Sequence, residues 1–107
     1  MKLTLNTFER KVLEKAINTY GIRNQEDVAI EEMAELTKAI IKNRRYNSDA
    51  TKNNIAEEIA DVVVMLAQLL FVHDVTKHID VSDYIDIKIQ RLANRLNEGE
   101  DNENSCY

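Results

Sequence analysis

The sequence contains no proline and only two glycines, Gly21 and Gly99. Proline and glycine are the residues that most strongly interrupt helices, and both are common in the turns that connect strands. A chain of 107 residues with so few of them can sustain long helices and carries few strand signals. We therefore expect an all-α fold, in a chain whose length suits one domain.

Apolar residues recur at helical spacing in four segments of the chain. The predicted helices cover residues 7–20, 25–42, 51–73 and 82–96. Asn6 and Glu9 form a capping-box pattern before the first helix, and Asn24 is expected to cap the second. Because the connections between them are short, we predict antiparallel neighbours in a four-helix, bundle-like domain.

The large apolar side chains of these helices are expected to face the core. In the second helix the predicted packing stripe consists of Ile30, Met33, Leu36, Thr37, Ile40 and Ile41. The third helix is apolar on most sides, which favours a central position. The segment 43–49, which contains Arg44 and Arg45, is predicted to be a polar connection, and the segment 73–80 a second one.

Negative charge gathers at the C-terminal end of the chain. Residues 98–107 carry four of the 19 acidic residues and no Lys or Arg. The remaining 15 acids nearly balance the 14 Lys and Arg residues, so the body of the chain is close to neutral. We predict one helical domain over residues 1–97 and an acidic, flexible tail over residues 98–107.

Composition also argues against several classes of partner. No basic face or stripe stands out, so DNA and RNA are not expected as partners. The longest apolar run, residues 62–72, is interrupted by Gln68 and is too short to span a bilayer. The single cysteine, Cys106, has no second cysteine to pair with, and the first residues lack the apolar core of a signal peptide. A cytoplasmic protein is therefore predicted.

Two predicted helices carry the same acidic pattern, an acidic pair followed by another acid three residues on. Residues three apart on a helix project from one face. Glu32 and Glu35 therefore share a face of the second helix, and Glu58 and Asp61 share a face of the third. If these two helices pack antiparallel, the four carboxylates meet across their interface.

Carboxylates gathered in a partly buried cleft cannot all stay ionised without a cation. Oxygen ligands without Cys or His favour a hard ion, namely Mg²⁺, Mn²⁺ or Ca²⁺. The alternative is that the acids form an ordinary solvated surface, as acidic runs on helices usually do. The repetition of the pattern on both helices favours a metal site.

The motifs resemble those of a known family. The pattern Glu-Glu-x-x-Glu at residues 31–35 is followed, after 22 residues, by Glu58-x-x-Asp61 at the start of an apolar helix. This combination is similar to the signature of MazG-type nucleoside-triphosphate pyrophosphohydrolases, an all-α superfamily. The similarity spans roughly residues 25–96.

The resemblance implies a reaction, namely cleavage of a nucleoside triphosphate between its α- and β-phosphates to give a monophosphate and pyrophosphate. By position, Glu32, Glu35, Glu58 and Asp61 would hold Mg²⁺, with Mn²⁺ as a substitute. Glu31 is the candidate for orienting or deprotonating the attacking water, and its alternative role is that of a solvated acid.

The negative charge of the substrate also needs cationic partners. Lys38 lies one turn beyond Glu35 on nearly the same face of the predicted helix. Lys88 matches the place where the family often sets a basic residue near the phosphates, and Arg91 follows it by three residues. For each of the three, an ordinary surface cation is the alternative. The resemblance further implies a homodimer or homotetramer.

Two other functions stay open at this point. One is a phosphoribosyl-ATP pyrophosphohydrolase, a relative that uses the same metal chemistry. The other is a non-catalytic helical module whose acids bind Ca²⁺ or a basic partner.

Overall fold

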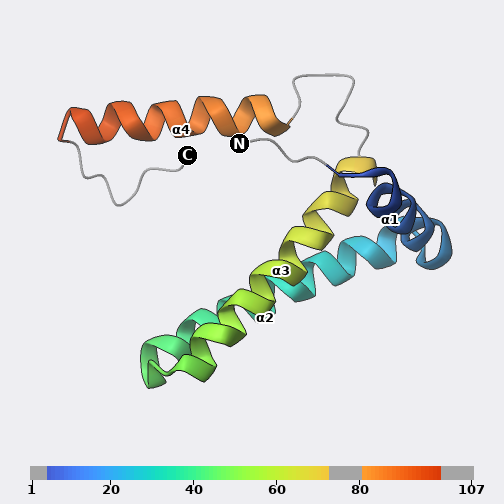
Figure 1. Cartoon of the computed structure of the whole chain (residues 1–107), viewed down its shortest axis with the longest axis horizontal. Helices are drawn as coiled ribbons and strands as arrows, with labels where there is room; N and C mark the ends of the chain where they lie inside the picture. The colour runs from blue at the N-terminus through green and yellow to red at the C-terminus, as the bar shows by residue number, and fades with distance from the viewer. Residues whose placement is uncertain (1–4, 73–80, 100–107) are drawn as a thin grey trace. The chain divides into compact units, whose positions relative to one another are not determined.

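The computed structural model describes residues 5–72 and 81–99 (Figure 1). It contains four helices: α1 (Thr7–Tyr20), α2 (Ile22–Tyr46), α3 (Asp49–Val72) and α4 (Val81–Asn97). No strand occurs in these two ranges, and the predicted all-α class is confirmed. The first three helices belong to one compact unit, and α4 belongs to a second unit that we describe by itself.

Helix α1 has the predicted bounds, and a cap fixes each of its ends. The Glu9 amide donates to Asn6 Oδ1 at 2.8 Å, while the Asn6 amide donates to Glu9 Oε1 at 3.0 Å. These reciprocal bonds form the expected capping box. At the other end Gly21 has a φ of 92°, which favours glycine, and its amide donates to the Ile17 carbonyl at 2.8 Å.

Helix α2 is longer at both ends than the sequence analysis predicted. It begins at Ile22, directly after Gly21, so Asn24 does not cap it. The Asn24 side chain instead donates to the Tyr20 carbonyl at 2.8 Å, and thereby satisfies the end of α1. Arg44 and Arg45 lie in the last turn of α2 and not in a connection, where positive charge suits the helix dipole.

The turn between α2 and α3 is only two residues long, Asn47 and Ser48. Asn47 adopts a left-handed conformation with a φ of 41°, which asparagine tolerates better than most residues. The Ser48 amide donates to Thr51 Oγ1 at 2.9 Å, and the Thr51 amide donates to Ser48 Oγ at 3.1 Å. The Thr51 hydroxyl also donates to Asn43 Oδ1 at 2.8 Å, which ties the start of α3 to the last turns of α2.

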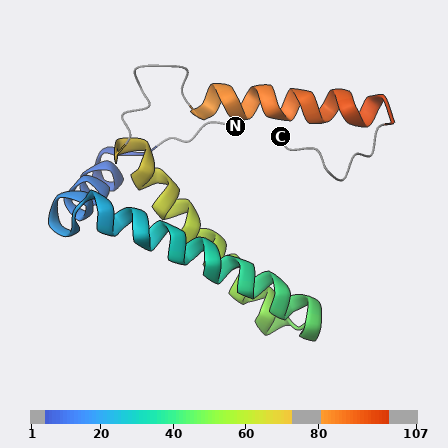
Figure 2. The same cartoon turned by 180° about the vertical axis from the view of Figure 1, so that it is seen from behind.

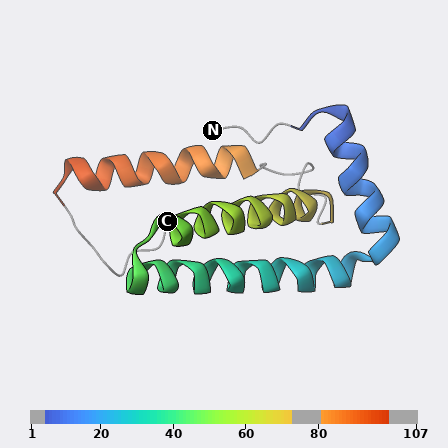
Figure 3. The ribbon, with the colours of Figure 1, turned by 60° about the horizontal axis from the view of Figure 1, so that its bottom comes forward.

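This turn brings α2 and α3 back along one another as an antiparallel pair (Figures 2 and 3). Their contacting positions follow alternating steps of three and four residues, the heptad spacing of coiled coils. On α2 the buried and half-buried positions of this row are Gln25, Ala29, Glu32, Leu36, Ala39 and Asn43. On α3 the row includes Thr51, Glu58, Asp61, Met65 and Gln68, of which only Asp61 is exposed. We call these two rows the α2–α3 seam.

Most of the predicted packing stripe of α2 lies outside the seam, and of its large apolar residues only Leu36 belongs to the seam. Ile30, Met33, Ile40 and Ile41 are 41–62% exposed, whereas the smaller Ala29 is 2% exposed. Two paired helices bury one stripe each, and on α2 the buried stripe is the seam. Large apolar side chains are exposed on the neighbouring helices as well, including Phe8, Val12 and Tyr20 on α1 and Ile59, Val63 and Leu66 on α3.

Helix α4 begins and ends within one residue of the predicted bounds. Ile85, Ile89 and Leu92 share one face of it, and with the half-buried Lys88 they line an apolar pocket of about 320 Å³. The predicted connection over residues 73–80 and the tail from residue 100 onward lie outside the described residues. The single domain over residues 1–97 stays a prediction.

Candidate metal centre

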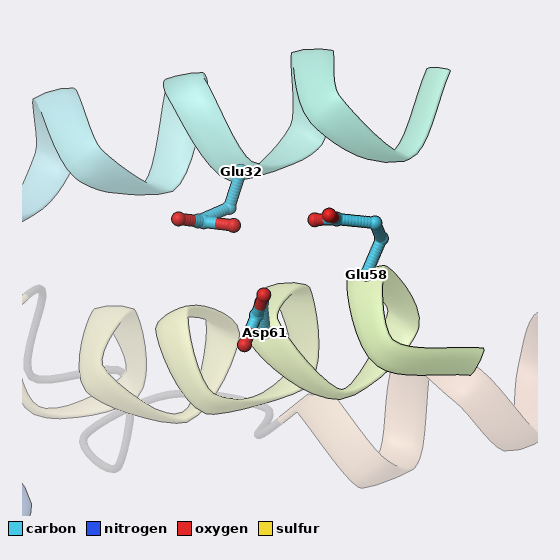
Figure 4. Close-up of side chains that lie close together, drawn as sticks. All are labelled: Glu32, Glu58 and Asp61. Carbon is cyan, nitrogen blue, oxygen red and sulfur yellow. The ribbon is translucent and has the colours of Figure 1, made fainter. Parts of the chain in front are cut away.

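Three carboxylates meet in the middle of the α2–α3 seam. Glu32 extends from α2 toward α3, while Glu58 and Asp61 extend from α3 toward α2 (Figure 4). One oxygen atom of each side chain lies within 4.8 Å of an oxygen of the other two. Glu32 and Glu58 are half-buried and Asp61 is exposed, so the cluster is open on one side.

The spacing of these residues explains why they meet. Glu58 and Asp61 are three residues apart, which places both on the seam side of α3. Glu32 occupies the same kind of seam position on α2, with Ala29 as its nearest buried neighbour along the row. Small side chains at a helix contact let the two axes approach closely. The carboxylates therefore occupy positions that apolar side chains fill in an ordinary helix pair.

Glu58 is the electrostatic centre of the cluster. Its Oε2 atom is buried and has no hydrogen-bond partner in the described part of the protein. Burial is the largest cause of a raised pKa for Glu58, and the negative charges of Asp61 and Glu32 raise it further. The charges of Glu35 and Glu57 act in the same direction.

A divalent cation fits this arrangement. A buried carboxylate oxygen without a partner is unfavourable, and most such atoms in folded proteins are satisfied. The cluster offers only carboxylate oxygens, which are the ligands that Mg²⁺, Mn²⁺ and Ca²⁺ prefer. A cation bound there would satisfy Glu58 Oε2 and offset the mutual repulsion of the three acids.

Glu35, the fourth predicted ligand, is not part of this close cluster. It is half exposed, and its Oε1 atom lies 3.7 Å from Lys38 Nζ one turn further along α2. Its negative charge still contributes to the raised pKa of Glu58, so Glu35 repels the charge of the cluster without belonging to it. Lys38 is itself 77% exposed.

The other predicted site residues lie away from the three carboxylates or on α4. Glu31 is exposed on α2 and does not belong to the cluster. Lys88 is half-buried on α4, and Arg91 is exposed on the same helix. The functional roles proposed for Glu31, Lys88 and Arg91 stay predictions.

Of three cations on one side of α2, only Lys38 was assigned to the substrate from the sequence. Lys42 and Arg45 lie with Lys38 along one side of α2, at intervals of four and three residues. That spacing was visible in the sequence, but it has meaning only if α2 continues to Tyr46, and the predicted helix ended at residue 42.

Comparison with known protein families gives a match over most of this chain. Residues 23–99, well over half of the chain, match the family model of the MazG nucleotide pyrophosphohydrolase domain. The match includes the three carboxylates of the cluster and the whole of α4. Comparison with curated proteins and with solved structures gave no match.

Proposed function

This chain belongs to the MazG nucleotide pyrophosphohydrolase family, and on this premise we propose that it hydrolyses nucleoside triphosphates. The products would be a nucleoside monophosphate and pyrophosphate. The family is typically metal-dependent. The observation that carries the proposal is Glu58, a half-buried carboxylate beside two further acids, whose buried oxygen has no hydrogen-bond partner among residues 5–72 and 81–99.

In this proposal Glu32, Glu58 and Asp61 hold Mg²⁺, with Glu35 joining them from the side, and Mn²⁺ can replace Mg²⁺. A bound divalent ion neutralises negative charge that develops on the reacting phosphate. The three carboxylates are already close together across the seam, so binding requires little rearrangement of α2 and α3.

The remaining steps are assigned to the other predicted site residues. Water attacks the α-phosphorus, the bond from this phosphorus to the oxygen that bridges to the β-phosphorus breaks, and pyrophosphate leaves. We assign Glu31 to orient this water or to accept its proton, because it is exposed and adjacent to Glu32. Lys38, Lys88 and Arg91 are assigned to the phosphates, since cations there would oppose their negative charge.

Exposed apolar surface supports an assembly of more than one copy. Most large apolar residues of α2 that the structure describes lie outside the α2–α3 seam and stay exposed. Side chains of this kind on several helices form surfaces that monomeric proteins rarely leave to water. We propose a homodimer or homotetramer in which these faces are covered.

Three predictions concern the domain organisation, the location and the partners of the chain. We keep one domain over residues 1–97, because the family match covers α2, α3 and α4 together. None of the described helices is long and apolar enough to cross a membrane. A cytoplasmic location and the absence of a nucleic-acid partner stay predictions.

Pyrophosphate release from a panel of NTPs and dNTPs tests this function. We expect release that requires Mg²⁺, stops in chelator, and falls at least about 100-fold in Glu58→Gln, as losses of key charged groups in active sites commonly do. Glu57→Gln is the matched control, because it removes the neighbouring exposed charge and should keep most of the activity.

Two outcomes would redirect the proposal. Turnover of phosphoribosyl-ATP alone, with no ordinary nucleotide hydrolysed, would assign the related pyrophosphohydrolase activity. Metal binding without turnover of any of these substrates, in folded protein, would instead support the non-catalytic helical module.

A further inference from the structure

One edge of α2, outside the α2–α3 seam, changes the sign of its charge in the middle of the helix. Successive residues of an α-helix advance by 100°, so residues separated by steps of three and four lie within a narrow arc, here about 80° wide. Along this edge three acids precede three cations, and all six residues are exposed: Asp27, Glu31, Glu35, Lys38, Lys42 and Arg45. We call these six residues the charged edge of α2.

Most of this charge is not neutralised within the described part of the chain. The two middle residues of the charged edge pair with one another, since Glu35 Oε1 lies 3.7 Å from Lys38 Nζ. Among residues 5–72 and 81–99, the outer two acids and the outer two cations of the edge form no ion pair. The acidic half and the basic half are therefore both open to a partner of opposite charge.

The order of the charges makes the edge complementary to itself. Asp27 and Arg45 are each nine residues from Leu36, while Glu31 and Lys42 are five and six residues from it. A two-fold axis level with Leu36 would bring the charged edges of two antiparallel copies together, with each acid opposite a cation. In a parallel pair in register, acids would lie level with acids and cations with cations. Charge therefore selects the antiparallel arrangement.

Apolar side chains beside the charged edge fit the same arrangement. Ile30 is 62% exposed in the acidic half, and Ile41 is 52% exposed in the basic half. In the basic half the three cations, Ile41 and Tyr46 line a pocket of about 320 Å³. Antiparallel pairing brings Ile30 of the partner subunit level with this pocket. Burial of apolar surface there adds stabilisation, which exposed ion pairs supply only weakly.

We infer that two copies of this chain pair through antiparallel α2 helices, with the acidic half of each charged edge on the basic half of the other. This inference rests on the assembly proposed above and names the surface that forms it. Every contact occurs twice, because the two-fold axis repeats it. Since Glu31 and Glu35 belong to the charged edge, the second copy lies beside the candidate metal centre.

Charge reversal tests this pairing by analytical ultracentrifugation. Asp27→Arg alone and Arg45→Glu alone should each raise the dissociation constant about tenfold, because each sets like charges opposite one another twice. The double variant Asp27→Arg/Arg45→Glu should restore the wild-type value, since it only exchanges the two partners. Lys52→Glu is the matched control, because it reverses an exposed cation on α3 and should associate like wild type.

A mixture of the two single variants makes the test more specific. Each variant repels its own kind, but Asp27→Arg and Arg45→Glu copies present opposite charges to one another. Mixed pairs should therefore form with about the wild-type dissociation constant.

The outcomes separate this inference from the proposals on which it rests. Wild type that associates, with single variants that associate equally well, would overturn the α2 pairing and leave the proposed assembly intact. Mixed pairs no tighter than the single variants, or an equal loss in Lys52→Glu, would also overturn it. A monomeric wild type would overturn the pairing and the assembly together, while pyrophosphate release tests the proposed hydrolysis independently.

Discussion

Polar side chains fill the α2–α3 seam in two different ways. Near its ends they satisfy one another, since Gln25 Nε2 donates to Gln68 Oε1 at 2.6 Å and Thr51 donates to Asn43 at 2.8 Å. In its middle three carboxylates face one another, and none of them can donate a hydrogen bond when ionised. The ends are complete without a ligand, whereas the middle gains from a cation.

Within this one interface, the polar pairs at the ends stabilise the fold, whereas the carboxylates in the middle are suited to binding a cation. A buried pair of neutral amides contributes modestly when both partners are present and is costly when one is missing. A buried carboxylate with no donor opposes folding in the absence of a cation. We therefore expect substitutions at the ends to change the free energy of unfolding and substitutions in the middle to change metal binding.

The largest effect is expected in the middle of the seam, where Glu58→Gln should remove the stabilisation by Mg²⁺. Mg²⁺ at a concentration 100 times its Kd should stabilise the wild type by about 2.7 kcal/mol, because it binds the folded state. Glu58→Gln should lose this gain, while Glu57→Gln should keep it. Thermal unfolding with and without the ion measures both, and an equal gain in Glu58→Gln would place the ion elsewhere.

A smaller effect is expected at the end of the seam where Gln25 and Gln68 are hydrogen-bonded. Gln68→Leu leaves the buried Gln25 amide without its partner and should cost about 1–3 kcal/mol in the free energy of unfolding. Urea unfolding should show that Gln25→Leu/Gln68→Leu recovers most of this loss, and that Mg²⁺ still stabilises both variants. A Gln68→Leu protein as stable as wild type would mean that the amide pair contributes nothing.

The smallest effect is expected in the pH dependence of the free energy of unfolding. Because the pKa of Glu58 is raised, the folded protein binds a proton more readily than the unfolded chain does. In chelator, stability should therefore fall as pH rises from the ordinary pKa of a glutamate through the raised pKa of Glu58. The slope should be reduced in Glu58→Gln.

With Mg²⁺ the sign should reverse, since the ion needs the ionised carboxylates and protons compete with it as pH falls. Urea unfolding across this pH range, in chelator and in Mg²⁺, gives both slopes. The same pH dependence in Glu58→Gln and wild type would show that another group causes it.

Local rules predicted the existence of the four helices and the placement of Glu58 and Asp61 on one face of α3. The capping box at Asn6 and Glu9 fixed the start of α1, and the three-residue spacing of Glu58 and Asp61 placed both on one face. These features depend only on residues close in sequence. For the same reason the all-α class followed from composition and periodicity.

The meeting of carboxylates in the seam was predicted, but most other seam positions of α2 were not, because α2 carries two competing stripes. One contains large residues such as Ile30 and Ile40, and the other contains small and polar residues such as Ala29 and Glu32. Side-chain size favoured the first, and only the alternating three- and four-residue steps favoured the second. Glu35 lies beside the seam because the row continues from Glu32 by four residues, to Leu36, and not by three.

The turn of Asn47 and Ser48 decides which residues face one another. A seam that repeats every seven residues would pack nearly as well if α3 slid along α2 by one repeat, about 10 Å. Such a slide would carry Glu58 and Asp61 away from Glu32 while leaving most helix contacts intact. A two-residue turn anchored through Thr51 to Asn43 has no slack for it. The alignment of the three acids is thus set at the far end of the hairpin, more than two turns from Glu58 itself.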